Sequence, residues 1–408
     1  MKPTLHPALI PLSFLAATAL AAAPADADRK PMKFMDILQM RSASSPDVSP
    51  DGKWMLYTLS VPDWKAAKSY TDIFLVSTVR GLESTRQMTF TKDKNETSPR
   101  WSRDGKFFVF LSNRDGSTAP GSSSATPASQ LYLMRPDGGE ARRITEVKDG
   151  ISSVSFSRDG KWLAFAAGKD EARQIWAFNV ATLETEAAKP LTRHATPVGS
   201  WQFSPDSRRI YFVAPDELDK TNKERKEKKF DVRIRNEPSP LAHLWAIDLA
   251  TKKETRLTSG TNYSVGSVTV SKDSRWIGFK GTPDNRYFRT VNDAPAYADL
   301  YLLDVAGGRI ERLTENADIS VEQHLLLAGQ PAARLFRLDD FHFFRNTRVY
   351  LRDVSDQGGK LKKLGADFDG DASIDSGRRT AGRSISTRDC GQRPSFAPWT
   401  PPPARSGR

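Results

Sequence analysis

Ser49-Pro-Asp-Gly-Lys53 is the first of five similar phrases along the chain. The other four are Ser102-Arg-Asp-Gly-Lys106, Ser157-Arg-Asp-Gly-Lys161, Ser204-Pro-Asp-Ser-Arg208 and Ser271-Lys-Asp-Ser-Arg275. Their serines lie 53, 55, 47 and 67 residues apart, so one supersecondary unit is copied along the chain. An alternating run such as Trp54-Met-Leu-Tyr57 follows each phrase. Because Asp with Gly or Ser tolerates tight turns, each phrase predicts a β-hairpin.

Two further runs complete each unit. The third strand is predicted at Ile73-Phe-Leu-Val76, Leu131-Tyr-Leu-Met134, Ile175-Trp-Ala-Phe178, Leu244-Trp-Ala-Ile247 and Leu300-Tyr-Leu-Leu303. The fourth is a short phrase that ends in Thr89, Thr145, Thr192, Thr258 or Thr314. Four short antiparallel strands per unit are typical of a propeller blade. We therefore expect an all-β fold over residues 28–375, a β-propeller of about seven four-stranded blades that is incomplete at its C-terminal end.

Residues 1–27 have the parts of a secretory signal peptide. Lys2 precedes an apolar stretch from Leu9 to Ala23, and Ala25-Asp-Ala27 has the small-x-small pattern that signal peptidase cleaves. A membrane anchor is the alternative, but the stretch is short for a span and a cleavage site follows it. We expect a secreted, periplasmic protein with no membrane span after signal removal.

These features together resemble a known group of enzymes. The blade phrases, the strand Leu244-Trp-Ala-Ile-Asp248, the Arg-x-Leu-Thr ends and the signal peptide are similar to the N-terminal propeller of prolyl oligopeptidase family serine peptidases, of the secreted bacterial dipeptidyl or acylaminoacyl peptidase type. The segment from Lys30 to Arg41 resembles the N-terminal helix of that family. The resemblance implies a propeller that restricts the access of peptides to an α/β-hydrolase domain with a Ser, Asp and His triad. TolB-type propellers share the blade phrase, so a standalone periplasmic propeller that binds a protein partner is the alternative.

The chain itself has no segment that matches the triad. Its serine needs a strand-to-helix elbow, commonly Gly-x-Ser-x-Gly, and Gly121-Ser-Ser-Ser124 lacks the second Gly. We expect loop or surface positions for the histidines, which are His6, His194, His243, His324 and His342. The single cysteine, Cys390, excludes an intramolecular disulfide and a cysteine-based zinc site. We predict no catalytic, cofactor-binding or metal-binding residues, no cofactor, and a chain that is inactive alone.

The repeat breaks down in two places. The spacing predicts blade phrases near residues 327 and 378, but the segments 321–338 and 376–408 contain none. Permitted codons for each segment encode a blade-like sequence in another frame, so we hypothesise two frame slips. The alternative for 376–408 is a disordered tail, because Pro394 to Arg408 is rich in Pro, Ser and Arg. In both cases the chain ends before a hydrolase domain.

The charge pattern predicts no nucleic-acid partner. Of the net charge of +12, residues 376–408 contribute +6 through seven arginines and one aspartate. Within the segment from Asp216 to Glu237, the run from Lys220 to Lys229 alternates in sign and predicts a solvated loop or helix. Three charged residues that follow it are candidates to face a peptide terminus, although solvated surface charge is the simpler interpretation: Arg233, Arg235 and Glu237. We expect peptides as the ligands if a hydrolase domain is joined, and the pattern predicts no particular oligomeric state.

Five tryptophans recur close to the blade phrases. They are Trp54, Trp101, Trp162, Trp201 and Trp276, which we assign to equivalent blade positions. At such positions we expect them to pack between neighbouring sheets, and not to form a ligand cage.

Overall fold

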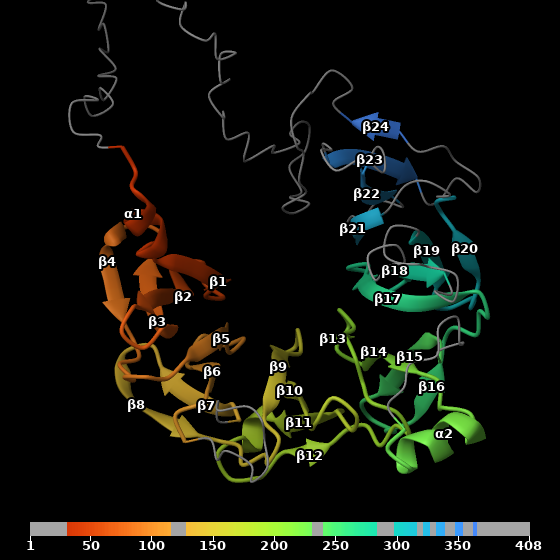
Figure 1. The fold of residues 1–408 in the computed structure, drawn as a ribbon, viewed down its shortest axis with the longest axis horizontal. Helices are drawn as coiled ribbons and strands as arrows, with labels where there is room; N and C mark the ends of the chain where they lie inside the picture. The colour runs from red at the N-terminus through yellow and green to blue at the C-terminus, as the bar shows by residue number, and fades with distance from the viewer. Residues whose placement is uncertain are drawn as a thin grey trace, which may run out of the picture.

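The computed structural model describes residues 31–115, 128–230, 240–283, 298–315, 321–326, 332–338, 347–353 and 362–364. Over these residues it forms six four-stranded sheets, each built from four strands that follow one another in the chain. Figure 1 shows the sheets side by side along an arc, with the first strand of each toward the middle and the last strand outside. This arrangement confirms the predicted β-propeller, and each sheet is one blade. The predicted signal peptide and the segment 376–408, where a seventh blade was expected, lie outside the described residues.

The strands are regular and short. Blade 1 consists of β1 (Ser42–Val48), β2 (Trp54–Asp63), β3 (Lys68–Ser77) and β4 (Gly81–Gln87), and blade 2 of β5 (Glu96–Trp101), β6 (Phe108–Ser112), β7 (Gln130–Arg135) and β8 (Gly138–Arg143). Blade 3 consists of β9 (Ile151–Phe156), β10 (Trp162–Ala167), β11 (Gln174–Asn179) and β12 (Lys189–Pro190), and blade 4 of β13 (Trp201–Phe203), β14 (Arg209–Pro215), β15 (Ala242–Asp248) and β16 (Glu254–Arg256). Blade 5 consists of β17 (Tyr263–Val270), β18 (Trp276–Pro283), β19 (Asp299–Asp304) and β20 (Ile310–Arg312), and blade 6 of β21 (Val321–Leu326), β22 (Ala332–Leu338), β23 (Thr347–Asp353) and β24 (Lys362–Leu364). The helical elements are α1 (Phe34–Leu38), the 3-10 helix η2 (Val180–Thr182) and α2 (Lys220–Glu227).

Blade 6 forms without the repeated phrase. The segment 321–338 has no blade phrase, yet β21 and β22 pair antiparallel within it. Backbone N–H and C=O groups pair in the same way for any side chain, so a strand ladder does not require the phrase. The two frame slips stay a hypothesis.

The core lies between neighbouring blades. Between blades 2 and 3, Val109 and Leu133 belong to one apolar cluster with Phe156 and Phe165. Similar clusters join blades 1 and 2, blades 3 and 4, and blades 4 and 5. All five residues of β6 are buried, which means that both faces of its sheet are covered. Each blade therefore depends on its neighbours for the burial of its apolar surface.

The five quoted phrases form the turn between the first and second strands of blades 1 to 5. In each turn the buried serine hydroxyl donates to the aspartate Oδ1 two residues later, at 2.5–2.7 Å. The same oxygen accepts the backbone N–H five residues after the serine, at 2.8–3.2 Å. The fourth residue, always Gly or Ser, has a φ between +59° and +74°. One shared hydroxyl thus closes each hairpin.

The tryptophan assignment is wrong in one respect, because the five residues occupy three different positions. Three of them follow the turn directly, and these are Trp54, Trp162 and Trp276. Trp101 precedes its serine, whereas Trp201 lies three residues before its own. Trp101 is 5% exposed and packs edge-on against Phe108, as expected of a core residue. The three after the turn are half-buried and carry cations over their rings, for example Lys252 at 4.7 Å from the ring centroid of Trp162.

We expect Ser157→Ala to lower the free energy of unfolding by about 1–3 kcal/mol, because the Trp162 N–H and the Asp159 carboxylate lose their shared partner. Lys161→Ala is the matched control, since the Lys161 side chain lies on the same turn and is 77% exposed. Urea unfolding followed by tryptophan fluorescence measures both variants. Equal losses in the two variants would contradict the role of the hydroxyl.

Candidate functional site

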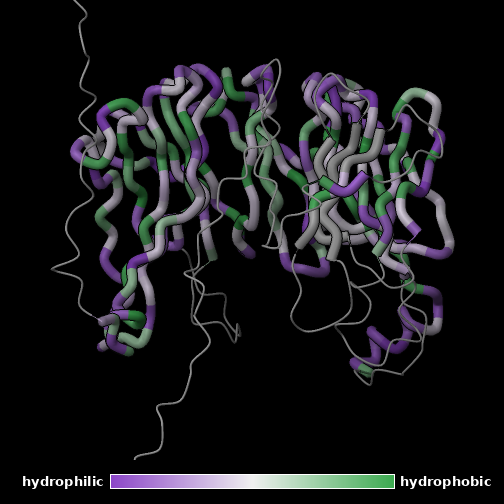
Figure 2. Tube along the Cα trace, turned by 90° about the horizontal axis from the view of Figure 1, so that it is seen from above, coloured by the Kyte–Doolittle hydropathy of each residue, from purple (hydrophilic) through white to green (hydrophobic). Residues whose placement is uncertain are grey.

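The two faces of the arc differ in their connections. One face, here called the turn face, carries the five serine turns. The opposite face, the loop face, carries the links from the second to the third strand of each blade, which vary from residues 64–67 to residues 216–241. α1 directly precedes β1 and α2 lies within the longest link, so both helices are on the loop face, and Figure 2 shows α2 projecting from the arc. Because variable loops on a rigid scaffold are the usual place for binding residues, the loop face is the candidate functional surface.

A repeated polar pair anchors every described blade from 1 to 5 at the loop face. The threonine after the fourth strand accepts a backbone N–H of the third strand at 2.8–2.9 Å. Its hydroxyl also contacts a polar side chain one residue earlier in that strand, at 2.7–3.2 Å. The five pairs are Asp72–Thr89, Gln130–Thr145, Gln174–Thr192, His243–Thr258 and Asp299–Thr314. These pairs hold the outer strand in register, which is a structural role.

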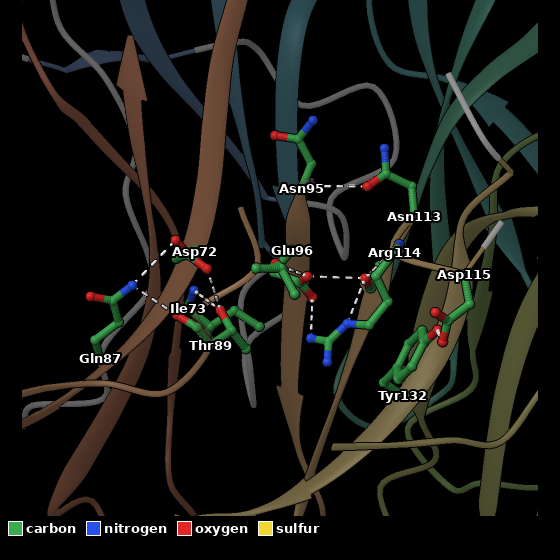
Figure 3. Close-up of polar contacts among 12 residues, drawn as sticks. Asp72, Ile73, Gln87, Thr89, Asn95, Glu96, Asn113, Arg114, Asp115 and Tyr132 are labelled. Carbon is green, nitrogen blue, oxygen red and sulfur yellow. Dashed lines mark hydrogen bonds and ion pairs between the residues drawn. The ribbon is translucent and has the colours of Figure 1, made fainter. Parts of the chain in front are cut away.

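Blade 2 adds a buried ion pair that the sequence did not reveal. The Glu96 side chain is fully buried at the start of β5, and its Oε2 lies 2.9 Å from Nη2 of Arg114. Its Oε1 accepts the Ser112 hydroxyl at 3.0 Å and also the Thr91 hydroxyl. Figure 3 shows Arg114 pointing at Glu96 from the link that follows β6. The carboxylate has partners on both oxygens, so it is held as a structural anion.

Arg114 also contacts Tyr132 of β7, close to the point where the link after β6 begins. Its guanidinium lies 4.8 Å from the ring centroid of Tyr132, whose hydroxyl donates to Asp115 Oδ2 at 2.6 Å. Burial, together with the bond to Asp115, raises the pKa of Tyr132. In the neighbouring blade, burial raises the pKa of Asp72, and the hydrogen bond from Thr89 partly offsets that effect. Both groups appear in Figure 3, where they flank the Glu96–Arg114 pair.

A second polar cluster lies at the loop face of blade 4. The Nδ1 atom of His194 lies 2.8 Å from Oε2 of Glu254, and the backbone N–H of Arg193 donates to the other oxygen at 3.2 Å. The His194 ring packs edge-on against Trp245 and Phe212, at centroid distances of 4.5 and 5.4 Å. His194 lies in a loop, as predicted, although its side chain is only 9% exposed.

His243 is buried in a strand, at 1% exposure, so the predicted loop or surface position is wrong for this histidine. It lies in β15 with the ring inside the blade, where Nδ1 contacts Thr258 at 3.2 Å. Its Nε2 lies 3.2 Å from Asp216 Oδ2, and Arg256 Nη1 lies 3.0 Å from Asp216 Oδ1. Burial lowers the pKa of His243, Arg256 adds to this effect, and Asp216 opposes it.

Asp216 begins the insertion that contains α2. The predicted charged run forms this helix, and none of its residues is buried. Lys223 pairs with Glu217 at 2.5 Å, and Lys226 reaches Glu171 of blade 3 at 3.0 Å. The charged candidates Arg233, Arg235 and Glu237 lie outside the described residues, as do His6, His342 and the segment 121–124. His324 lies in β21, where no side chain is described.

The described clusters contain paired charged side chains but do not assemble a catalytic centre. Neither cluster places a serine or cysteine against a histidine base, which is the arrangement that activates the nucleophile of a Ser–His or Cys–His enzyme. Among the residues that the structure covers, no group of three His, Cys, Asp or Glu side chains has a metal-binding arrangement. Within the same residues, no helix is long and apolar enough to cross a membrane.

An apolar segment lies on the loop face next to blade 1. Six side chains around α1 are between 38% and 73% exposed, and they are Met32, Phe34, Met35, Ile37, Leu38 and Met40. α1 has no buried residue. Exposed apolar groups in such density mark an interaction surface.

We expect Arg114→Met to destabilise the fold by about 3 kcal/mol or more, because it leaves the buried Glu96 carboxylate without its charge partner. The double variant Glu96→Gln/Arg114→Met should cost less, since neither charge remains. Arg142→Met serves as the control, because Arg142 and its partner Glu184 are 48% and 63% exposed. Chemical unfolding measures all three variants, and a double variant that is as unstable as the single one would argue against a buried charge.

We expect the stability of the fold to decrease as the pH falls below about 6.5. Since burial lowers the folded-state pKa of His243, the unfolded chain takes up the proton first. The contribution of the neutral ring is complete above the unfolded pKa and is lost as the pH falls from there toward the folded pKa. His243→Gln should flatten this pH dependence in unfolding measurements between about pH 8 and about pH 5. An unchanged slope in the variant would show that other groups cause it.

Comparison with known proteins gives partial matches to peptidases and to TolB. Residues 142–171 match the family described as WD domain, G-beta repeat. The uncharacterized peptidase YuxL of Bacillus subtilis (strain 168) is 30% identical over 141 residues, which cover 34% of this chain and 19% of that protein. Dipeptidyl-peptidase 5 of Porphyromonas endodontalis is 30% identical over 131 residues, or 32% of this chain and 17% of that enzyme. Tol-Pal system protein TolB of Francisella tularensis subsp. mediasiatica is 33% identical over 100 residues, covering 24% of this chain and 20% of TolB.

Among solved structures, a chain from a study of two prolyl endopeptidases supports the fold. It matches with a TM-score of 0.52 at 13% identity, covering 79% of this chain and 42% of that chain. The matched stretches thus span about a fifth of the curated relatives' length. The chain is a β-propeller partly similar in sequence to peptidases and to TolB.

Proposed function

We propose that this chain is the noncatalytic, substrate-gating propeller region of a secreted serine peptidase that acts on peptides and is related to the prolyl oligopeptidase family. The observation that carries the proposal is the similarity to two peptidases over 141 and 131 residues, against 100 residues for TolB. In this role the propeller restricts which peptides reach a catalytic α/β-hydrolase domain. That domain, with its Ser, Asp and His groups, is encoded beyond the present sequence.

The apolar segment around α1 supports a second folded domain on the loop face. Phe34 is 73% exposed and Met32 68%, so both side chains need a cover that the described blades do not provide. A catalytic domain seated beside blade 1 buries these groups and brings its active site near the two polar clusters. Exposed apolar surface of this kind is typical of a contact with a partner.

The first test is to sequence the genomic locus from the codon of Glu315 through about 1 kilobase beyond the codon of Arg408, a length chosen to cover a typical hydrolase domain. We expect a Gly-x-Ser-x-Gly elbow with Asp and His downstream, in one frame with blades 1 to 5 once the two slips are corrected. The exported product of that frame should begin at Asp28 and hydrolyse peptides, whereas the present chain should not.

Methionine oxidation gives a structural readout of the same proposal. Met32, Met35 and Met40 should oxidise readily in the present chain, where they are 68%, 47% and 61% exposed, and should be protected in the longer product. Absence of any hydrolase sequence at the locus would sink the proposal.

The TolB similarity favours one second candidate, a standalone periplasmic propeller that binds a protein partner. A locus without hydrolase sequence, together with periplasmic recovery of a soluble propeller, would support this candidate instead.

A further inference from the structure

The turn face has a cavity between blades 1 and 2, opposite the loop face. Its volume is about 700 Å³, and its walls include Trp54, Trp101 and Leu75 together with the turn residues Pro50 and Asp104. All of these residues belong to the first two blades near the Ser49 and Ser102 turns. The proposed gating role makes no use of this cavity.

Between the turns of blades 2 and 3, the place that corresponds to this cavity is filled by a side chain of the protein itself. The second residue of the blade 2 turn is Arg103, and its side chain packs over Gly160 of the blade 3 turn, where an added Cβ would lie 3.0 Å from Arg103 Cβ. Its Nε donates to the Ser157 carbonyl at 3.3 Å. A guanidinium therefore bridges the turns of blades 2 and 3.

At blades 1 and 2 the same position holds a proline. Pro50 approaches the equivalent glycine, with its Cδ 3.7 Å from a Cβ built on Gly105, but its ring ends there. Proline has no group that reaches the Ser102 carbonyl, which corresponds to the acceptor of Arg103. The cavity occupies the place that an arginine side chain takes one blade later.

The chemistry of the walls favours a cation. Asp51, Asp104 and Asp137 line the cavity with one cation, Arg86, and the Nζ atom of Lys106 lies 3.6 Å from Asp104 Oδ2, so these five groups carry a formal charge of −1. Arg86 already donates to the Pro136 carbonyl at 2.9 Å, and the guanidinium groups of Arg86 and Arg80 lie 5.6 and 5.8 Å from the Trp54 ring centroid. The Ser49 hydroxyl and the Lys53 N–H hold the pKa of Asp51 below its usual value, so this carboxylate stays ionised at neutral pH. Carboxylates and an indole face are the groups that bind a guanidinium best.

We propose that the cavity binds the guanidinium group of an arginine side chain from another polypeptide segment. The bound group takes the place that Arg103 takes between blades 2 and 3. Asp51, Asp104 and Asp137 supply the negative charge, and the tryptophans supply the apolar wall. The site is independent of the proposed peptidase lineage, because it needs only blades 1 and 2 and lies on the opposite face.

The test uses the full chain without its leader and three short blocked peptides, measured by titration calorimetry. Acetyl-Gly-Arg-Gly-amide is the probe. The same peptide with lysine in place of arginine tests whether binding needs a guanidinium group or only a positive charge. The same peptide with citrulline keeps the shape of arginine without its charge. We expect the arginine peptide to bind about tenfold more tightly than the citrulline peptide, and its affinity to fall with added salt. Equal affinity for the arginine and citrulline peptides would overturn the proposal.

Two variants locate the site on the protein. Pro50→Arg supplies the guanidinium from within the chain, as Arg103 does, and should weaken binding of the arginine peptide about tenfold or more. Pro205→Arg is the matched control, because it adds arginine at the same position of the blade 4 turn, and binding should stay within about twofold of the parent chain. Asp137→Asn removes wall charge without touching a serine turn and should also weaken binding. Full retention of binding in both Pro50→Arg and Asp137→Asn would place the peptide elsewhere and refute the site.

Discussion

Burial of both faces of each sheet against its neighbours is the constraint on which the rest of this structure depends. β6 and β10 are buried almost throughout, so a single blade exposes apolar surface on two sides. Neighbouring blades cover that surface, for example where Ala164 and Ile175 of blade 3 meet Phe212 of blade 4. The free energy gained by burying this surface therefore depends on pairs of neighbouring blades, and a change in the packing of one blade alters the stability of the next.

Within this packing, two hydroxyl groups hold the ends of each of blades 1 to 5. A serine closes the hairpin at the turn face, and a threonine ties the third and fourth strands at the loop face. Because local hydrogen bonds hold both ends of the blade, the links on the loop face can differ in length without disturbing the strands. This division explains why the turns repeat closely while the loop face carries links of different lengths, an apolar helix and a long charged insertion.

The sequence was sufficient for the features that repeat. The serine phrases and third-strand runs predicted the strands of blades 1 to 5, because a turn residue and a period of two are local properties. The Glu96–Arg114 and His194–Glu254 pairs were missed, because they join residues 18 and 60 positions apart that only the fold brings together. The histidine prediction was wrong for a related reason: a polar ring at position 243 is tolerated inside a blade when Thr258 and Asp216 satisfy its nitrogens. The tryptophans were misaligned because proximity to a phrase does not define a register position.

The position of α2 shows how the loop face depends on the interior of a blade. The helix has no buried residue, so apolar packing does not hold it. Its pairs with Glu217 and Glu171 are largely exposed, and such pairs contribute little to stability. The insertion is fixed at its base, where Asp216 contacts the buried His243 and the Arg256 guanidinium. These two partners lie in β15 and β16, and the apolar residues of β15 pack against the neighbouring blades. A charged projection on the loop face therefore keeps its place only as long as the packing between blades keeps His243 in position.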